Sequence, residues 1–253
     1  MRFASLGSGS KGNSTIIEAG STVVLVDCGF GIRSLTTRLL ARNVVPEQIT
    51  AILITHEHSD HWKGVEVLSA KFNIPVYLSA GCFKARNISV DSKNFHIIDS
   101  HTDFVVGDLN VTPVPVPHDA REPVQYVFTD GMVRLGILTD LGHYTPHVIS
   151  VYSQCHGLLL EANYDEEMLA MGPYPRFLKD RVSGLFGHLS NRQALDLLKK
   201  LDLSYLQRLL LGHISDKNND TNIISELLST ADLGGTAITF AGQDVGSDWQ
   251  ELG

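Results

Sequence analysis

The sequence predicts an α/β fold in which strands and helices are mixed within one domain, residues 1–253. Short apolar runs of strand length alternate with turn residues in the first half of the chain. Helical apolar patterns alternate with similar runs in the second half, and no linker or low-complexity segment separates the halves. A hydrophobic content of 43% and a charged content of 19% are ordinary for a globular protein. The pattern is compatible with two similar halves packed face to face.

The first half is expected to contain more strand than helix. Strands are predicted at 2–6, 15–18, 22–26, 51–54, 75–78 and 105–113, and helices at 32–41 and 61–72. Leu35, Leu39 and Leu40 supply the apolar stripe of the first helix. A long hairpin at 125–138 follows, because Asp130-Gly131 is a typical two-residue turn.

The second half is expected to alternate strands with amphipathic helices. Strands are predicted at 156–160, 206–211 and 237–240, and helices at 166–171, 190–201 and 219–228. Ser190 and Gln193 form a capping-box pattern that fixes the start of the middle helix.

The densest group of metal-ligand side chains follows the apolar run 51–54, in the sequence His56-x-His58-x-Asp60-His61. Alternation along a strand and the turn after it would direct the three imidazoles and the carboxylate toward one point. Zn accepts these ligands, and so do Mn and Fe. The simpler interpretation is a polar turn with Ser59 or Asp60 as a helix N-cap. A His-Glu-x-x-His protease is excluded because Asp60 stands where the second histidine would be.

Other candidate ligands also stand at the ends of apolar runs. Asp27, His118, Asp140 and His213 each follow a predicted strand or apolar segment. A single residue of this kind is usually only a turn residue or a cap. Their recurrence beside the cluster at 56–61 instead favours one metal centre built from several strand ends.

A glycine-rich turn, Gly7-Ser8-Gly9-Ser10-Lys11-Gly12, resembles a dinucleotide-binding fingerprint but lacks its context. The fingerprint requires a helix after the last glycine, whereas β-branched residues and a hairpin follow here. We expect a turn between antiparallel strands, whose N–H groups, with Ser8, Ser10 and Asn13, could bind a phosphate.

Charge and cysteine content limit the partners and the compartment. The net charge of -8 does not favour nucleic-acid binding by bulk attraction. Three scattered cysteines argue against a disulfide framework, and neither a signal peptide nor a membrane-length apolar segment is visible. We expect a cytoplasmic protein with no membrane partner; the oligomeric state is open, with a homodimer as one option.

The order Asp27, His56-x-His58-x-Asp60-His61, His118, Asp140, His213 resembles the five-motif series of the metallo-β-lactamase superfamily, over nearly the whole chain. This resemblance implies a four-layer αβ/βα sandwich with two mixed sheets and two divalent metal ions at one sheet edge. His56, His58 and His118 would hold one metal. Asp60, His61 and His213 would hold the second, Asp140 would bridge both, and Asp27 would support a ligand. Two such ions together acidify a bridging water for hydrolysis, with Asp60 in the catalytic shell.

His188 and Glu161 are candidates for proton handling outside the metal ligands. His188 precedes a predicted helix N-terminus, and a phosphodiesterase needs a proton for its leaving oxygen. Ser190 and Asn191 at that N-terminus are candidate phosphate ligands. Glu161 would either polarise His188 or cap the next helix, and His188 would otherwise simply pack at the helix start.

Four segments together resemble the YycJ (WalJ) group, which is related to the RNase Z and PhnP phosphodiesterases. They are residues 5–14, 161–165, 187–191 and Tyr174-Pro175-Arg176-x-Leu178-Lys179-x-Arg181. The resemblance implies a 5′-to-3′ exonuclease acting on single-stranded or 5′-phosphorylated DNA, with Arg176, Lys179 and Arg181 contacting phosphates.

The numbers of residues between the motifs argue against two classes of substrate. The span from His118 to Asp140 leaves no room for the tRNA-clasping arm of RNase Z, and the span from Asp140 to His213 is too short for a β-CASP domain. The remaining alternatives are a hydrolase of small cyclic phosphodiesters, a glyoxalase II-like thioester hydrolase and a metal-binding regulatory module.

Overall fold

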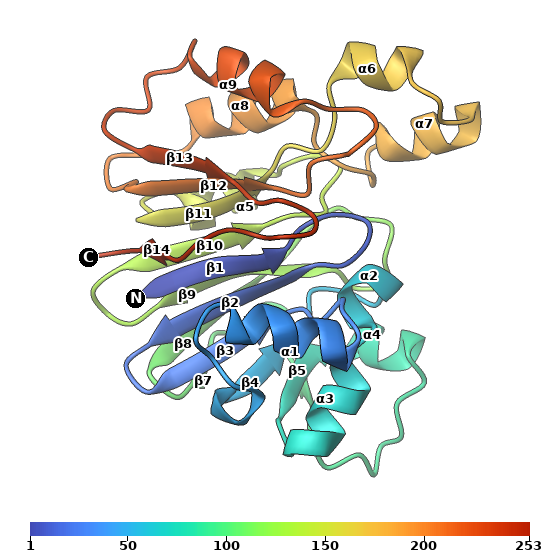
Figure 1. Ribbon diagram of the computed structural model, residues 1–253, viewed down its shortest axis with the longest axis vertical. Coiled ribbons are helices and arrows are strands. Elements are labelled where there is room, and N and C mark those ends of the chain that lie inside the picture. Colours follow the sequence, from blue (N-terminus) through green and yellow to red (C-terminus); the bar gives the residue numbers. More distant parts are fainter.

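The computed structural model describes residues 1–253 as two seven-stranded mixed sheets packed face to face (Figure 1). The first sheet has the order β14-β1-β2-β3-β4-β5-β6, and the second β13-β12-β11-β10-β9-β8-β7. The strands are β1 (Arg2–Gly7), β2 (Ser14–Ala19), β3 (Thr22–Val26), β4 (Ala51–Leu53), β5 (Val76–Ser79), β6 (Phe95–Ile98), β7 (Phe104–Val106), β8 (Leu109–Pro115), β9 (Val124–Thr129), β10 (Arg134–Leu138), β11 (Gly157–Glu161), β12 (Arg208–Gly212), β13 (Ala237–Phe240) and β14 (Gln250–Glu251).

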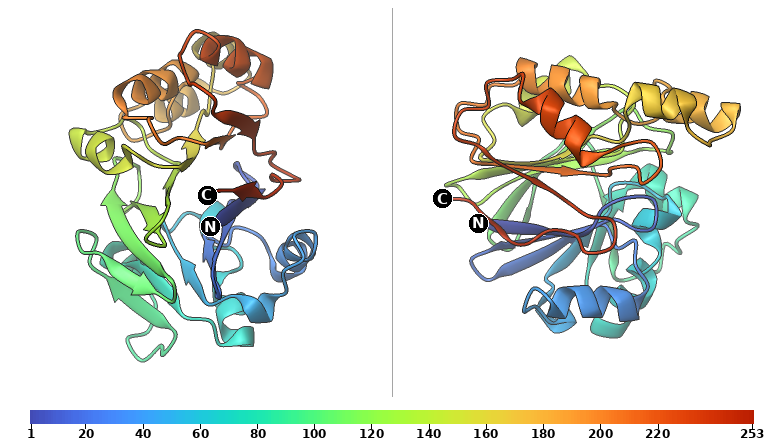
Figure 2. Two further views of the ribbon diagram at one scale, coloured as in Figure 1. Left: turned by 90° about the vertical axis from the view of Figure 1, so that its left-hand side faces the viewer. Right: turned by 45° about the horizontal axis from the view of Figure 1, so that its top comes forward.

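Helices cover the two outer faces of this pair of sheets (Figure 2). Those of the first half are α1 (Ile32–Leu40), η1 (Pro46–Gln48), α2 (Ser59–Trp62), α3 (Val65–Phe72) and α4 (Ala80–Ala85). Those of the second half are α5 (Pro146–Tyr152), α6 (Glu166–Met171), α7 (Arg176–Val182), α8 (Asn191–Lys200) and α9 (Thr221–Leu228). None of them combines the length and the apolar character needed to cross a membrane.

Three apolar cores separate the four layers. The central core joins the inner faces of both sheets and includes Phe3, Tyr126 and Phe128. The two outer cores lie between each sheet and its helices, as with Leu35 of α1 on one side and Leu197 of α8 on the other. All three cysteines are free and buried. The predicted αβ/βα sandwich is therefore confirmed.

Several predicted elements need correction. The helix expected at 61–72 is two helices, α2 and α3, separated at Lys63-Gly64. A Cβ at Gly64 would lie 2.2 Å from the carbonyl oxygen of Phe30, so the chain packs too closely there for a larger residue. The strand expected at 105–113 is the hairpin of β7 and β8, because Gly107 has a positive φ of 54°. The turn between β9 and β10 spans 130–133 and is longer than the predicted two residues.

Tyr126 links the second sheet to the metal-ligand loop and provides a test of the packing. Its fully buried hydroxyl donates to the carbonyl of Ile54, 2.7 Å away, two residues before His56. We expect Tyr126→Phe to lower the free energy of unfolding by about 1–2 kcal/mol in urea titrations, because the buried carbonyl loses a donor. Tyr205→Phe, at an exposed site, is the matched control and should leave it unchanged. Equal effects of both substitutions would contradict this role.

Candidate metal centre

Strand direction places the predicted ligand loops at common sheet edges. β10, β11 and β12 are parallel, so the residues that end them or follow them, Asp140, Glu161 and His213, reach the same edge. β8 points the same way, since it is antiparallel to β9 and β9 is antiparallel to β10, and it brings His118 there. In the first sheet, β1, β3 and β4 likewise point one way. The glycine loop, Asp27 and His56–His61 therefore share an edge.

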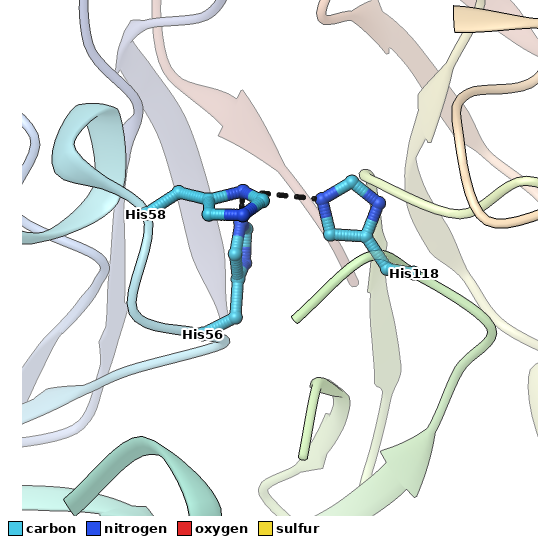
Figure 3. Close-up of side chains that lie close together, drawn as sticks. All are labelled: His56, His58 and His118. Carbon is cyan, nitrogen blue, oxygen red and sulfur yellow. Dashed lines mark hydrogen bonds between the residues drawn. The ribbon is translucent and has the colours of Figure 1, made fainter. Parts of the chain in front are cut away.

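His56, His58 and His118 direct ring nitrogens toward one another (Figure 3). His58 Nδ1 lies 3.0 Å from His56 Nε2 and 3.4 Å from His118 Nε2. Nitrogen ligands bound at about 2.0–2.1 Å in a tetrahedral zinc site lie about 3.3–3.4 Å apart. The spacing of these three nitrogens therefore fits three ligands of one divalent metal ion.

A second group of ligands lies beside the first. The carboxylate of Asp60 and the Nε2 atom of His61 are 3.6 Å apart, and these two residues form a compact group with His213. Asp140 lies between the groups: its Oδ2 is 3.4 Å from His61 Nε2, and its Oδ1 is 3.4 Å from His213 Nε2. Asp140 also shares a compact group with His56 of the first set.

Two buried atoms of the second group have no hydrogen-bond partner. They are Oδ2 of Asp140 and Nε2 of His213. Leaving such atoms unpaired in the interior costs free energy, so buried polar groups normally have partners. A divalent cation would supply the missing partner to both atoms, and we conclude that this donor set fits a metal ion.

Asp27 and Thr55 contact the Nδ1 atoms of the histidines that follow β4. The Thr55 N–H donates to Asp27 Oδ1 at 2.9 Å, and its hydroxyl donates to Asp27 Oδ2 at 2.8 Å. His61 Nδ1 donates to the same Oδ2, 2.7 Å away, which directs Nε2 into the centre. Thr55 Oγ1 also lies 2.9 Å from Nδ1 of His56. Such contacts fix the ring orientation of ligand histidines.

Glu161 fixes the ring orientation of two histidines of the second sheet in the same way. Its fully buried Oε1 lies 2.9 Å from His213 Nδ1 and 2.7 Å from His188 Nδ1. Its Oε2 accepts the backbone N–H of Leu189 at 3.0 Å. The predicted contact between Glu161 and His188 is thus present, and one carboxylate orients both a candidate ligand and the candidate proton donor.

The buried charges perturb one another strongly. Burial would raise the pKa of Asp140, but His213 and His61 hold it well below its usual range. Burial lowers the pKa of His61, but Asp27 and Asp140 raise it to about 10. Burial likewise opposes the shift of His213, whose pKa Asp140 raises to about 9. The carboxylates therefore raise the pKa values of both histidines above that of a free imidazole, so a metal ion binding there would compete with protons.

Three residues of the centre adopt left-handed backbone conformations. Asp27, Asp140 and His213 have φ values of 62°, 55° and 54°. Residues other than glycine rarely adopt this region, and strain of this kind collects at functional sites. At each strand end the positive φ turns the chain sharply where a side chain of the centre is needed.

Ser8 and Asn13 in the glycine turn hold ligand loops. Ser8 Oγ accepts the backbone N–H of His213 at 2.7 Å, and Asn13 Nδ2 lies 3.3 Å from Asp60 Oδ2. The N–H groups of Ser8, Gly9, Lys11, Gly12 and Asn13 are all used in hydrogen bonds within the protein. The N–H groups expected to be free for a phosphate are therefore largely occupied, and of the three predicted phosphate-binding side chains only Ser10 lines the cleft.

The other predicted substrate contacts are divided between the cleft and its surroundings. Arg181 lines the cleft, whereas Arg176 and Lys179 line a separate groove on the opposite side of α7. Ser190 is buried as the N-cap of α8 and also donates to Glu166, and Asn191 is buried in a reciprocal amide pair with Asn219. Neither of these two side chains lines the cleft.

The cleft over the centre has a volume of about 630 Å³, and most of the residues that line it are polar or charged. His58, Asp60, His118, Asp140, His188 and His213 contribute to its wall. The opposite wall comes from α7 and from the loop 214–217. The arrangement exposes the open side of the centre to a substrate while Asp27, His56, His61 and Glu161 stay buried.

Three residues at the centre, Thr55, Asp119 and Asn163, were not identified from the sequence. Asp119 lies beside the open side of the first group, with Oδ1 3.4 Å from His118 Nε2, and its Oδ2 accepts from Arg181 Nε at 2.6 Å. Asn163 donates from Nδ2 to the carbonyl of His213 at 2.7 Å. The position of Asp119 directly after His118 was an available signal, whereas Asn163 stands in the segment 161–165 with no pattern that indicates its contact with His213.

Metal binding should compete with protons. Because the raised pKa values of His61 and His213 keep both protonated at neutral pH, binding must displace these protons. We expect the apparent affinity for Zn²⁺ to rise from pH 6 toward about pH 9, the pKa of His213, and proton release to be measurable by calorimetry in buffers of different ionisation enthalpy. An affinity independent of pH over this range would contradict the assignment.

The substitution Asp27→Asn tests whether the Asp27 carboxylate supports the second ligand group through its contact with His61. Asparagine tolerates the positive φ at this position but cannot hold His61 by charge. We expect the metal affinity of the group formed by Asp60, His61 and His213 to fall about 10- to 100-fold, as measured by metal titration. Asp99→Asn, an exposed carboxylate in a loop, is the matched control. Unchanged affinity in Asp27→Asn would refute this role for the carboxylate.

Comparison with known proteins agrees with this geometry. Residues 22–214 match the Beta-lactamase superfamily domain. The chain is 34% identical over 242 residues to exodeoxyribonuclease WalJ of Streptococcus pneumoniae serotype 2 (strain D39 / NCTC 7466), covering 92% of this chain and 90% of that protein. It is 32% identical over 224 residues to exodeoxyribonuclease YycJ of Bacillus anthracis, covering 87% and 84%.

Solved structures confirm the fold. The metallo-β-lactamase fold protein YhfI from Bacillus subtilis has a TM-score of 0.76 and 16% identity over 99% of both chains. A diphosphatase of the PhnP family has a TM-score of 0.68 and 19% identity, covering 100% of this chain and 98% of that one. With its ligand series at one edge of paired mixed sheets, the chain belongs to the metallo-β-lactamase-fold superfamily, and within it to the family of the WalJ and YycJ proteins.

Proposed function

We propose that this protein is a metal-dependent phosphodiesterase that degrades DNA as a 5′-to-3′ exonuclease. The observation that carries the proposal is the pair of ligand groups joined by Asp140 at the floor of an open polar cleft. Paired metal ions are a common solution for phosphodiester hydrolysis. The names of the WalJ and YycJ relatives, both exodeoxyribonucleases, support DNA as the substrate.

The ligand set fits divalent metal ions, and we propose two per chain. His56, His58 and His118 would hold one, and Asp60, His61 and His213 the other, with Asp140 shared. Imidazole and carboxylate donors suit Zn or Mn, and Fe is a further option. When bound, the ions would acidify a water and offset negative charge on the scissile phosphate. We further propose that residues 1–253 act as one domain in the cytoplasm.

His188 and Arg181 would act on the substrate directly. His188 Nδ1 faces Glu161, so its other ring nitrogen is available to the cleft, which His188 lines. A protonated His188 would donate to the leaving oxygen, and the Glu161 carboxylate would stabilise its charge. Arg181 uses only Nε for Asp119, which leaves both Nη groups for a phosphate.

The substrate class is tested by assaying the metal-reconstituted protein on three compounds in parallel. We expect cleavage of 5′-phosphorylated single-stranded DNA and of bis-p-nitrophenyl phosphate, and none of S-lactoylglutathione. His58→Ala should lose at least about a hundredfold in kcat while circular dichroism shows that it stays folded. Hydrolysis of the thioester alone would replace this proposal with a glyoxalase II-like function.

Arg181 and Arg176 form a matched pair for testing the phosphate contact. They lie on the same helix, but only Arg181 lines the cleft. We expect Arg181→Ala to raise KM for DNA by about tenfold, the usual scale of a charge-assisted hydrogen bond, and Arg176→Ala to raise it by less than about twofold. Equal effects of the two substitutions would mean that α7 attracts DNA only through its net charge.

A further inference from the structure

The helix α7 forms a wall of the cleft but is poorly packed. None of its residues from Arg176 to Val182 is buried. Leu178, Arg181 and Val182 face the cleft. In Figures 1 and 2, α6 and α7 project beyond the end of the sheets instead of lying on them. The core therefore does not account for the apolar side chains of this segment.

Three large apolar side chains between residues 176 and 187, in α7 and the loop that follows it, are exposed. Phe177 is 72% exposed, Leu185 69% and Phe186 57%. Phe177 precedes Leu178 and lies one helical turn before Arg181, so it is next to the cleft-facing side of α7. Phe186 is fixed beside the cleft, because its carbonyl accepts the N–H of Asp119 at 3.0 Å and Gly187 lines the cleft. The carbonyl of Leu185 is held by His143 Nδ1 at 2.9 Å. Clustered exposed apolar residues generally mark a binding surface.

The charge around these residues favours a polyanion over an apolar protein surface. Residues 171–189 contain Arg176, Lys179 and Arg181 but only one acid, Asp180, in a chain whose net charge is -8. Asp180 pairs with Arg176, and Asp119 pairs with Nε of Arg181 only. The Nη groups of Arg181, which have no protein partner, remain available on the same helix, one turn after Phe177. Aromatic rings interleaved with basic side chains are the composition that binds single-stranded nucleic acid, since every base offers a face for stacking.

We propose that Phe177, Leu185 and Phe186 form a stacking surface for unpaired bases, which selects single-stranded nucleic acid at the cleft. This inference rests on the proposed phosphodiesterase function and names its substrate class. The bases next to the scissile phosphate would stack on Phe177 and Phe186 while Arg181 contacts the backbone. Paired bases in a duplex are already stacked within the helix and cannot use these rings, so a duplex end would have to fray before cleavage.

The test compares substrates that differ only in their bases. The metal-reconstituted full chain is assayed on a 5′-phosphorylated single-stranded DNA, on the same strand with abasic sites near its 5′ end, and on the blunt duplex. We expect the unmodified chain to prefer the base-bearing single strand over both others. Phe177→Ala and Phe186→Ala should each reduce this preference in kcat/KM by about fivefold or more. Tyr205→Ala, an exposed aromatic residue whose loop precedes β12 at the opposite edge, is the control and should keep the preference.

The outcomes separate this inference from the function on which it rests. If the unmodified protein cleaves no DNA, the proposed function fails. If it cleaves DNA but Phe177→Ala and Phe186→Ala keep the full preference for bases, the stacking surface is wrong and the function stands. If these substitutions instead convert a dimer into a monomer on size-exclusion chromatography with light scattering and leave the base preference intact, the surface binds a second copy of the chain and the proposal is overturned.

Discussion

The buried carboxylate of Asp140 is the constraint on which the site depends. It is almost inaccessible, its Oδ2 has no hydrogen-bond partner, and ring nitrogens of His61, His188 and His213 lie 3.4–3.7 Å from its oxygens. A carboxylate in such a place is costly unless positive charge compensates it. The carboxylate raises the pKa values of His61 and His213, so these imidazoles can supply part of that charge, and divalent ions would supply it more fully. Binding of metal ions would therefore remove the free-energy cost of burying this carboxylate.

Each of the two sheets supplies side chains that hold imidazoles close to Asp140. Asp27 and Thr55 orient the imidazoles that follow β4, and Glu161 orients His213 and His188 from the second sheet. Ser8 in the glycine loop, part of the first sheet, holds the backbone of His213 in the second. Since ligands come from both sheets, the centre exists only when the sheets are packed against each other. Metal binding and the packing of the central core should therefore stabilise one another.

The sequence predicted the parts that are local and missed those that depend on contacts between distant residues. The ligands were identifiable because each one follows a buried apolar strand, and strand direction then brings them together. The role of Ser8 rests on a contact 205 residues away, and no pattern near Ser8 indicates it. The helix α7 was missed because it buries no residue and so has no apolar periodicity. The exposure of Phe177 on this helix, and of Phe186 in the loop after it, is the feature that the fold does not explain.

We propose that two metal ions share Asp140. Anomalous diffraction from crystals grown with Zn²⁺ or Mn²⁺, recorded on both sides of the metal absorption edge, would locate them. We expect two peaks about 3.5–4 Å apart, one among His56, His58 and His118 and one among Asp60, His61 and His213, with Asp140 beside both. A single peak remote from Asp140, or none at saturating metal, would contradict it.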